Sequence, residues 1–342
     1  MALLQFLGRT NALNSLKLKE GLVNNYPYCA AVNRVIKHDI DPFIVETPVP
    51  TIHDVLQHKY NNQTLEELCL ERATYLRNLP QKKFIMYSGG IDSTLALISI
   101  IKTHSLAELE NVYICASSDS IKEFPEFWND IARIFKGRIQ SSHQHVEVFL
   151  KQGIVITGEL GDQITGSDVA IQLASLYGEE VLFQSFEPIM TKFYNQAYGP
   201  NRLVENFKPT ITKSLYPITT AWEWVWWVNF TNKWNSVKYR MLQVKGWEDQ
   251  KNTFRNVHHF YDTLDFQIWS MHNPDKKIKN NLNSYKFVQK KIITDYTGYL
   301  DYGNKPKVPS LGNLWQVKGI NEGIDTNFNF LTREETIGYI NK

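Results

Sequence analysis

Short apolar runs alternate with helical patterns between residues 64 and 170. Two stretches, 92–102 and 126–135, have the apolar spacing of helices. Four runs have the length and apolar content of buried strands: KKFIMY (82–87), NVYICA (111–116), HVEVF (145–149) and GIVIT (153–157). Strands that alternate with helices predict βαβ units. The expected fold class is therefore α/β, with a Rossmann-like, mostly parallel sheet.

A further helix is predicted directly before the first strand. Thr64 and Glu67 form the capping-box pattern T-L-E-E, in which each side chain bonds to the backbone N–H of the other residue. Leucine and alanine residues follow at roughly helical spacing. Pro80 ends this helix, because proline cannot donate a backbone hydrogen bond.

The pattern divides the chain into three parts. Residues 1–63 contain several prolines that interrupt any long helix, and their structure is left open. Residues 64–175 are expected to form the alternating α/β domain. Residues 176–342 lack that alternation and are rich in Trp, Tyr and Lys, so we expect a mainly helical region that completes the site.

Composition and charge narrow the classes of function. The chain is 43% hydrophobic and 21% charged, which is typical of a globular protein. Its net charge of +2 gives no general attraction to nucleic acid or to anionic membranes, so neither is an expected partner. The three cysteines are far apart, no apolar run reaches membrane-spanning length, and the start lacks the positive region of a signal peptide. These features favour a cytoplasmic protein.

The strongest chemical signal is the segment SGGIDST at residues 88–94, here called the glycine loop. It lies between a predicted strand and a predicted helix. Gly89 and Gly90 let the backbone approach a phosphate closely, and the helix N-terminus supplies positive potential to an anion. Hydroxyl donors are added by Ser88, Ser93 and Thr94. The alternative is a plain glycine turn before a capped helix.

Asp92 gives the glycine loop a further property. A carboxylate repels a bare phosphate, so its expected role is to hold Mg²⁺ beside the nucleotide. The loop also lacks the lysine of a Walker A motif, so ordinary γ-phosphoryl transfer is not indicated.

A second acidic segment follows the last predicted strand. GELGD at residues 158–162, here called the acidic loop, places Asp162 at the carboxyl end of that strand. Because carboxyl ends of parallel strands share one edge of a sheet, Asp92 and Asp162 are expected to share metal ions. The alternative for this segment alone is a glycine-rich acidic turn.

The glycine loop resembles the SGGxDS signature of the PP-loop ATP pyrophosphatases. This resemblance covers about residues 64–170. It implies that ATP binds on a Rossmann-like sheet and is cleaved between its α- and β-phosphates. It also implies backbone contacts to adenine from the end of the second strand, at Ala116 and Ser117.

The acidic loop resembles the GExxD segment of the asparagine-synthetase-type synthetase domain. The resemblance implies that Asp162 is a second Mg²⁺ ligand, that Glu159 faces the reacting centre and that Gly158 belongs to the nucleotide-binding set. Further on, the segment from Asp262 to Phe266 is distantly similar to the family's substrate-side segment. Two lysines near the C-terminus are similar to a late Arg-Pro-Lys-type segment that binds pyrophosphate: Lys305 and Lys307.

The chain departs from asparagine synthetases at its start. Those enzymes carry an N-terminal glutaminase whose nucleophile is the Cys after the initiator Met, whereas position 2 here is Ala2 and about 80 residues precede the glycine loop. The expected substrates are a small carboxylic acid and ammonia or an amine, including one on a separate partner. The expected reaction is ATP-dependent adenylation followed by amide formation. The alternative is a PP-loop enzyme that modifies a nucleobase or an RNA base.

Three other features favour structural roles. The tryptophans between 222 and 227 are expected to pack a helix against the sheet domain. His258 and His259 have no partner at metal-ligand spacing. The lysines between 276 and 291 are expected to form a solvated helix face.

Lys307 provides the first testable prediction. A lysine that meets charge developing on the phosphates acts mainly in the transition state, so its loss lowers kcat with little change in ATP affinity. Lys307→Ala is expected to reduce kcat strongly, and Lys307→Arg to restore little, because a planar guanidinium does not replace a compact ammonium. The measurements are kcat and ATP binding by calorimetry. Retained kcat in Lys307→Ala with loss in Lys305→Ala would assign the role to Lys305.

Overall fold

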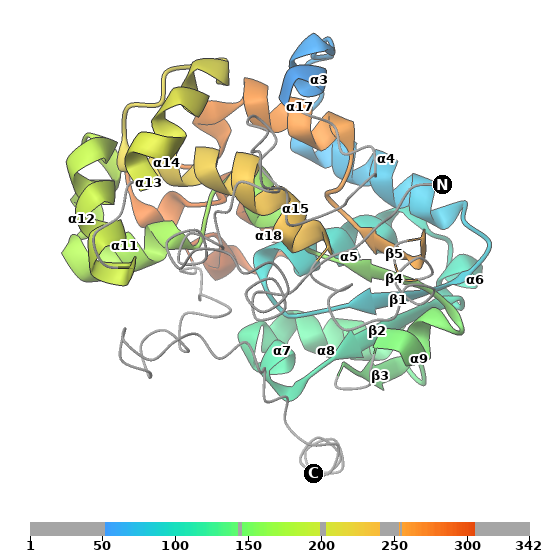
Figure 1. Cartoon of the computed structure of the whole chain (residues 1–342). Helices are drawn as coiled ribbons and strands as arrows, with labels where there is room; N and C mark the ends of the chain where they lie inside the picture. The colour runs from blue at the N-terminus through green and yellow to red at the C-terminus, as the bar shows by residue number, and fades with distance from the viewer. Residues whose placement is uncertain (1–51, 143–145, 199–202, 240–252, 254, 305–342) are drawn as a thin grey trace, which may run out of the picture.

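A five-stranded sheet organises the molecule (Figure 1). The computed structural model describes residues 52–142, 146–198, 203–239, 253 and 255–304. All strand pairs are parallel, and the strand order is β3-β2-β1-β4-β5. The chain therefore runs from β1 outward to β3 at one edge and returns to β4 on the other side of β1, and β5 forms the opposite edge of the sheet. This confirms an α/β fold with a Rossmann-like parallel sheet.

The described elements have the following bounds. The strands are β1 Lys82–Met86, β2 Val112–Ala116, β3 Ile139–Ser141, β4 Gly153–Thr157 and β5 Val257–His259. The helices of the first half are α3 Ile52–Gln57, α4 Leu65–Arg77, α5 Ile91–Thr103, α6 Leu106–Leu109, α7 Ser118–Glu123, α8 Pro125–Ile134, α9 Val146–Leu150 and α10 Gly161–Thr165. Those that follow are α11 Val169–Tyr177, α12 Phe186–Tyr198, α13 Leu203–Phe207, α14 Ala221–Val228, α15 Trp234–Tyr239, α17 Leu264–His272 and α18 Phe287–Thr297. A π-helix, η5, spans Asn229–Lys233, and 3-10 turns span Glu179–Phe183 (η3), Lys208–Lys213 (η4), Pro274–Lys276 (η7), Leu282–Ser284 (η8) and Leu300–Asn304 (η9).

Most of the predicted elements are confirmed. Strands β1, β2 and β4 lie where the apolar runs placed them, and helices α4, α5 and α8 match the helical patterns. The predicted strand at 145–149 is wrong, because α9 begins at Val146 and the third strand is Ile139–Ser141. The alternation in HVEVF is typical of a strand, but Phe149 and Leu150 are buried from a short helix that packs beneath β4.

The fifth strand comes from the C-terminal region. Residues Val257–His259 pair in parallel with Val155–Thr157 of β4. The sequence did not predict this strand, since VHH is short, polar and about 100 residues from its partner. Pairing with an existing strand edge supplies the stabilisation that a three-residue strand cannot supply by itself.

Both faces of the sheet are covered, as parallel sheets require. Alternate residues face opposite sides, so Ile85, Ile114 and Ile156 join the main core, which includes the apolar side chains of α5. Phe84, Cys115 and Val155 point to the other face and pack with the α9 side chains. Cys115 is a buried core thiol, as expected.

The helical region lies beside the sheet, with α11 to α14 at the left of Figure 1. Its centre is aromatic: Trp224, Trp226, Trp227 and Trp234 are almost fully buried. Three of their indole N–H groups donate hydrogen bonds: Trp224 Nε1 to Tyr194 Oη at 3.2 Å, Trp226 Nε1 to Ser270 Oγ at 3.2 Å and Trp227 Nε1 to Thr210 Oγ1 at 2.9 Å. The four tryptophans singled out in the sequence, Trp222, Trp224, Trp226 and Trp227, are all buried on α14, which confirms that they serve packing. Helix α14 contacts the helices α10, α11 and α12.

The lysine-rich stretch differs from its prediction. Lys276, Lys279 and Lys291 are exposed, but Lys277, Lys286 and Lys290 are buried. The Lys277 ammonium lies 4.0 Å from the Trp226 ring centre and donates to the Ser270 carbonyl at 2.6 Å. Aromatic and carbonyl partners thus compensate for lost hydration, which sequence spacing alone does not reveal.

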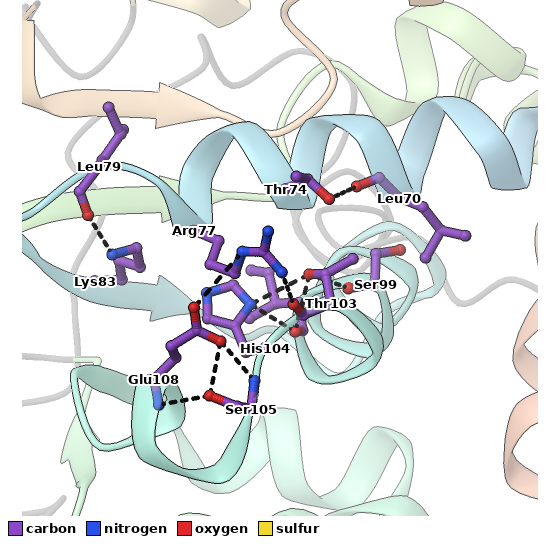
Figure 2. A network of polar contacts seen from close by, with 11 residues as sticks. Leu70, Thr74, Arg77, Leu79, Lys83, Ser99, Thr103, His104, Ser105 and Glu108 are labelled. Atoms are coloured by element: carbon purple, nitrogen blue, oxygen red, sulfur yellow. Dashed lines mark hydrogen bonds and ion pairs between the residues drawn. The ribbon is translucent and has the colours of Figure 1, made fainter.

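A network of polar contacts at the C-terminal end of α5 connects α4, α5 and α6 (Figure 2). Arg77 of α4 donates to the Thr103 carbonyl at 2.7 Å and lies 3.7 Å from the Glu108 carboxylate. Ser105 and Glu108 form a capping box at the start of α6. Burial lowers the pKa of His104, whose Nδ1 donates to the Ile100 carbonyl at 2.8 Å. Among the described residues, no helix has the length and apolarity needed to cross a membrane.

The capping box at Thr64 yields a stability prediction. Thr64 Oγ1 accepts from the Glu67 N–H at 3.2 Å, and the Glu67 carboxylate accepts from the Thr64 N–H at 2.7 Å. Thr64→Ala is expected to lower the free energy of unfolding by about 1 kcal/mol. Thr64→Ser keeps the capping oxygen and should stay close to wild type. Chemical denaturation of both variants is the measurement, and equal stability of Thr64→Ala and wild type would contradict the cap.

Candidate functional site

The glycine loop and the acidic loop leave neighbouring strands at one edge of the sheet. The glycine loop follows β1, and the acidic loop follows β4, which pairs with β1 through to Met86 and Thr157. The chain goes from β1 to β2 on one side and reaches β4 on the other. This is a topological switch point, where ligands bind in open α/β sheets because the flanking loops diverge.

Internal hydrogen bonds fix the shape of the glycine loop. Gly89 has φ = 79°, and a Cβ at this position would lie 2.2 Å from the Ser120 carbonyl oxygen, so only glycine fits. Ser93 Oγ donates to the Gly90 carbonyl at 3.1 Å, and Thr94 Oγ1 donates to the Gly89 carbonyl at 3.3 Å. The buried hydroxyls of Ser93 and Thr94 thus hold the loop itself.

The remaining groups of the loop have the chemistry to attract an anion. Ser88 is exposed, and its Oγ lies 2.9 Å from Ser93 Oγ. Helix α5 starts directly after Gly90, so the N–H groups of its first turn have no partners within the helix. Together with the helix dipole these groups favour a phosphate at this end.

The acidic loop packs directly against the glycine loop. A Cβ on Gly158 would lie 2.8 Å from the Ser93 nitrogen, and a Cβ on Gly161 would lie 2.3 Å from Asp92 Cγ. Both glycines are therefore required by the close approach of the two loops. Leu160, between them, has the left-handed φ of 71°, a conformation that costs a non-glycine residue about 1–3 kcal/mol. Strain of this kind is typical of functional turns.

Lys286 joins the two acidic groups. Its Nζ pairs with Asp92 Oδ2 and lies 2.7 Å from Asp162 Oδ1. The lysine side chain is fully buried, while the Asp92 and Asp162 side chains are 17% and 25% exposed. The two carboxylates predicted to act together therefore meet at one point, around a cation that the sequence did not single out.

The backbone at Lys286 explains how it reaches this position. It has φ = 58° and precedes the first residue of α18, and its N–H donates to the Lys277 carbonyl at 2.9 Å. The left-handed conformation turns the chain sharply into the helix. The sequence gives no signal for it, because left-handed lysine is uncommon and the partners lie more than 120 residues away.

Two tyrosines complete the surroundings of the carboxylates. Tyr285 Oη donates to Asp162 Oδ1 at 3.0 Å, and Tyr261 Oη donates to the Asp92 carbonyl at 3.0 Å. Burial, and next the charge of Asp162, raises the pKa of Tyr285 well above its usual value. Both phenols therefore remain hydrogen-bond donors near neutral pH.

The helical region holds α10, the helix that carries Asp162. Ser270 Oγ donates to the Ile164 carbonyl at 2.5 Å. Asn229, the first residue of the π-helix, donates to the Gly166 carbonyl at 2.7 Å and accepts from Gln163 Nε2 at 2.9 Å. These buried contacts fix a five-residue helix that could not be stable alone.

The remaining predicted site residues lie around this centre. Ala116 ends β2, and Ser117 caps α7, whose Ser120 carbonyl contacts Gly89. Glu159 follows β4, and its N–H donates to Thr157 Oγ1 at 3.2 Å. These residues share the carboxyl edge of the sheet with the two loops.

Lys305 and Lys307 lie outside the described residues. The last described segment, η9, ends at Asn304. Within it, the Tyr302 ring stacks on Phe124 at 4.3 Å between centroids, immediately after α7. The described chain thus ends close to the glycine loop.

The donor set at Asp92 and Asp162 fits Mg²⁺. Among the residues that the structure describes, no group of three or more His, Cys, Asp or Glu side chains could hold a metal. Mg²⁺ in phosphate-handling enzymes is bound by one or two carboxylates together with substrate phosphates and water. Lys286 Nζ lies between the two carboxylates, so the space between them already holds a positive charge.

Comparison of the chain with protein-family models, with curated proteins and with solved structures found no match.

Lys286 provides a stability prediction. Removing the ammonium leaves two neighbouring carboxylates without their shared cation, and breaking a buried pair in this way costs about 3–5 kcal/mol. Lys286→Met is expected to lower the free energy of unfolding by about 3 kcal/mol. The control is Lys291→Met, which removes an exposed lysine paired with Asp295 at 2.6 Å and should cost less than about 1 kcal/mol. Equal effects in urea denaturation would show that the central pair contributes no more than a surface pair.

Proposed function

We propose that the chain is an ATP pyrophosphatase with the PP-loop fold, which adenylates a substrate carboxylate and then forms an amide. The observation that supports this most directly is the convergence of Asp92 and Asp162 on Lys286. Two motifs separated by about 70 residues resemble one enzyme family, and in the structure their acidic residues both contact the Lys286 ammonium. Parallel pairing of β1 with β4 brings the two loops to one edge, and Lys286 gives their carboxylates a common partner.

The glycine loop and the start of α5 would bind the β- and γ-phosphates. Backbone N–H groups and the helix dipole supply this attraction without a lysine in the loop. Asp92 and Asp162 would hold Mg²⁺, which when bound supplies charge neutralisation to the pyrophosphate leaving group. Lys286 would contribute a further positive charge from its buried position behind the two carboxylates, where burial strengthens electrostatic contacts.

The chemistry has two steps. A substrate carboxylate oxygen attacks the α-phosphorus, the bond to the bridging oxygen breaks and pyrophosphate leaves. An amine or ammonia then attacks the activated carbonyl carbon and AMP leaves with the bonding pair. Glu159 would orient the amine or accept its proton, since it follows β4 at the same edge.

The products of ATP cleavage test this proposal. With a panel of carboxylic acids and amines, turnover is expected to give AMP and pyrophosphate in equal amounts, because attack occurs at the α-phosphorus. The measurement is ³¹P NMR or coupled detection of both products. Formation of ADP and phosphate would exclude the proposal, and activity with nucleobases or RNA alone would favour the alternative substrate class.

Variants of the two carboxylates link those products to the site. Asp92→Asn and Asp162→Asn are each expected to lower the rate by at least about 100-fold, the scale of losing a main charge-stabilising group. Asp295→Asn, which changes an exposed aspartate on α18, is the matched control and should remain near wild type. Normal rates in both site variants would place the metal elsewhere.

A further inference from the structure

A hydrogen-bonded chain connects the acidic loop to the helical region through β5. His259, the last residue of β5, lies opposite Thr157, the last residue of β4. Its Nδ1 lies 2.7 Å from Thr157 Oγ1, and its Nε2 lies 2.9 Å from the Lys238 carbonyl oxygen. Thr157 Oγ1 in turn accepts from the Glu159 N–H at 3.2 Å. Four groups from three elements thus form one continuous path.

The direction of each bond follows from donor chemistry. The Lys238 carbonyl can only accept, so His259 Nε2 carries the proton. In the neutral ring Nδ1 is then an acceptor, so the Thr157 hydroxyl donates to it. The oxygen of that hydroxyl keeps its lone pairs for the Glu159 N–H. Burial lowers the pKa of His259, which keeps the ring neutral as this arrangement requires.

The surroundings hold this path rigidly. Arg72 donates to the carbonyls of His259 and Phe260, each at 3.1 Å, which fixes the end of β5. The Lys238 ammonium pairs with Asp262 at 2.7 Å, and Asp262 follows β5 closely. His259 itself is 5% exposed. Its ring therefore has one position relative to the sheet.

The path ends where the acidic loop is strained. Glu159 lies between two constrained residues. Gly158 is in close contact with the start of α5, and Leu160 has a left-handed φ. A left-handed leucine persists only if neighbouring contacts over-determine it. The bond from the Glu159 N–H to Thr157 is such a contact.

We propose that His259 is a positioning residue that sets the backbone of Glu159 through Thr157. The proposal rests on the proposed function where it concerns catalysis, since it assigns Glu159 a part in the reaction. The hydrogen-bonded path itself does not depend on any activity.

Amide exchange tests the path. Thr157→Val removes the hydroxyl and keeps the side-chain shape, so hydrogen exchange at the Glu159 amide is expected to become about tenfold faster. His259→Phe, which keeps a ring without nitrogens, should have the same effect. Thr157→Ser keeps the hydroxyl, so exchange at the Glu159 amide should be as slow as in the wild-type chain. Thr74→Val is the matched control, because it removes a hydroxyl that bonds within α4, to the Leu70 carbonyl (Figure 2). Unchanged exchange in both Thr157→Val and His259→Phe would overturn the proposal.

Kinetics test whether the path acts through Glu159. Thr157→Val is expected to lower kcat for pyrophosphate release about tenfold with KM for ATP within about twofold, and Thr157→Ser to recover it. In a Glu159→Gln background the same change should add less than about twofold, because coupled residues are not additive. Full additivity, or a Glu159→Gln variant as active as wild type, would refute positioning of Glu159. Absence of AMP-forming turnover in the wild-type chain would refute the proposed function instead, and amide exchange would still decide the path.

Discussion

The ion contacts of Lys286 with Asp92 and Asp162 are the interaction on which the site depends. Two carboxylates at one edge of a sheet repel each other, and their proximity is stable only with positive charge between them. A fully buried ammonium supplies that charge from Lys286, the residue directly before α18. A metal ion bound between the two carboxylates would supply the same positive charge.

The helical region gives that arrangement its rigidity. Helix α10 is too short to hold Asp162 by itself, so its carbonyls are bonded by Asn229 of the π-helix and by Ser270 of α17. The tryptophan-rich core behind these residues excludes water, and each lost hydrogen bond there would leave a buried polar group unsatisfied. The aromatic cluster thus helps to position the short helix that carries Asp162.

Close backbone contact is the second constraint. Gly89, Gly158 and Gly161 each occupy a place where a Cβ would overlap another segment. They allow the glycine loop, α7 and the acidic loop to approach one another closely. Leu160, with its left-handed φ, and the path through His259 lie at this same edge of the sheet. The path depends on the pairing of the three-residue strand β5 with β4, because this pairing places His259 opposite Thr157.

Local spacing and composition are sufficient to predict the parallel α/β fold, strands β1, β2 and β4, the cap of α4 and the two loops. The sequence placed Asp92 and Asp162 at strand ends, and parallel topology then required them to be close. Tertiary structure alone decided the rest. The helix at Val146–Leu150 overrides an alternating pattern because its apolar face is buried under the sheet. Lys286 and His259 contact Asp92, Asp162 and Thr157, which lie more than 100 residues away along the chain. No local pattern specifies which distant partner will compensate a buried charge or a buried imidazole.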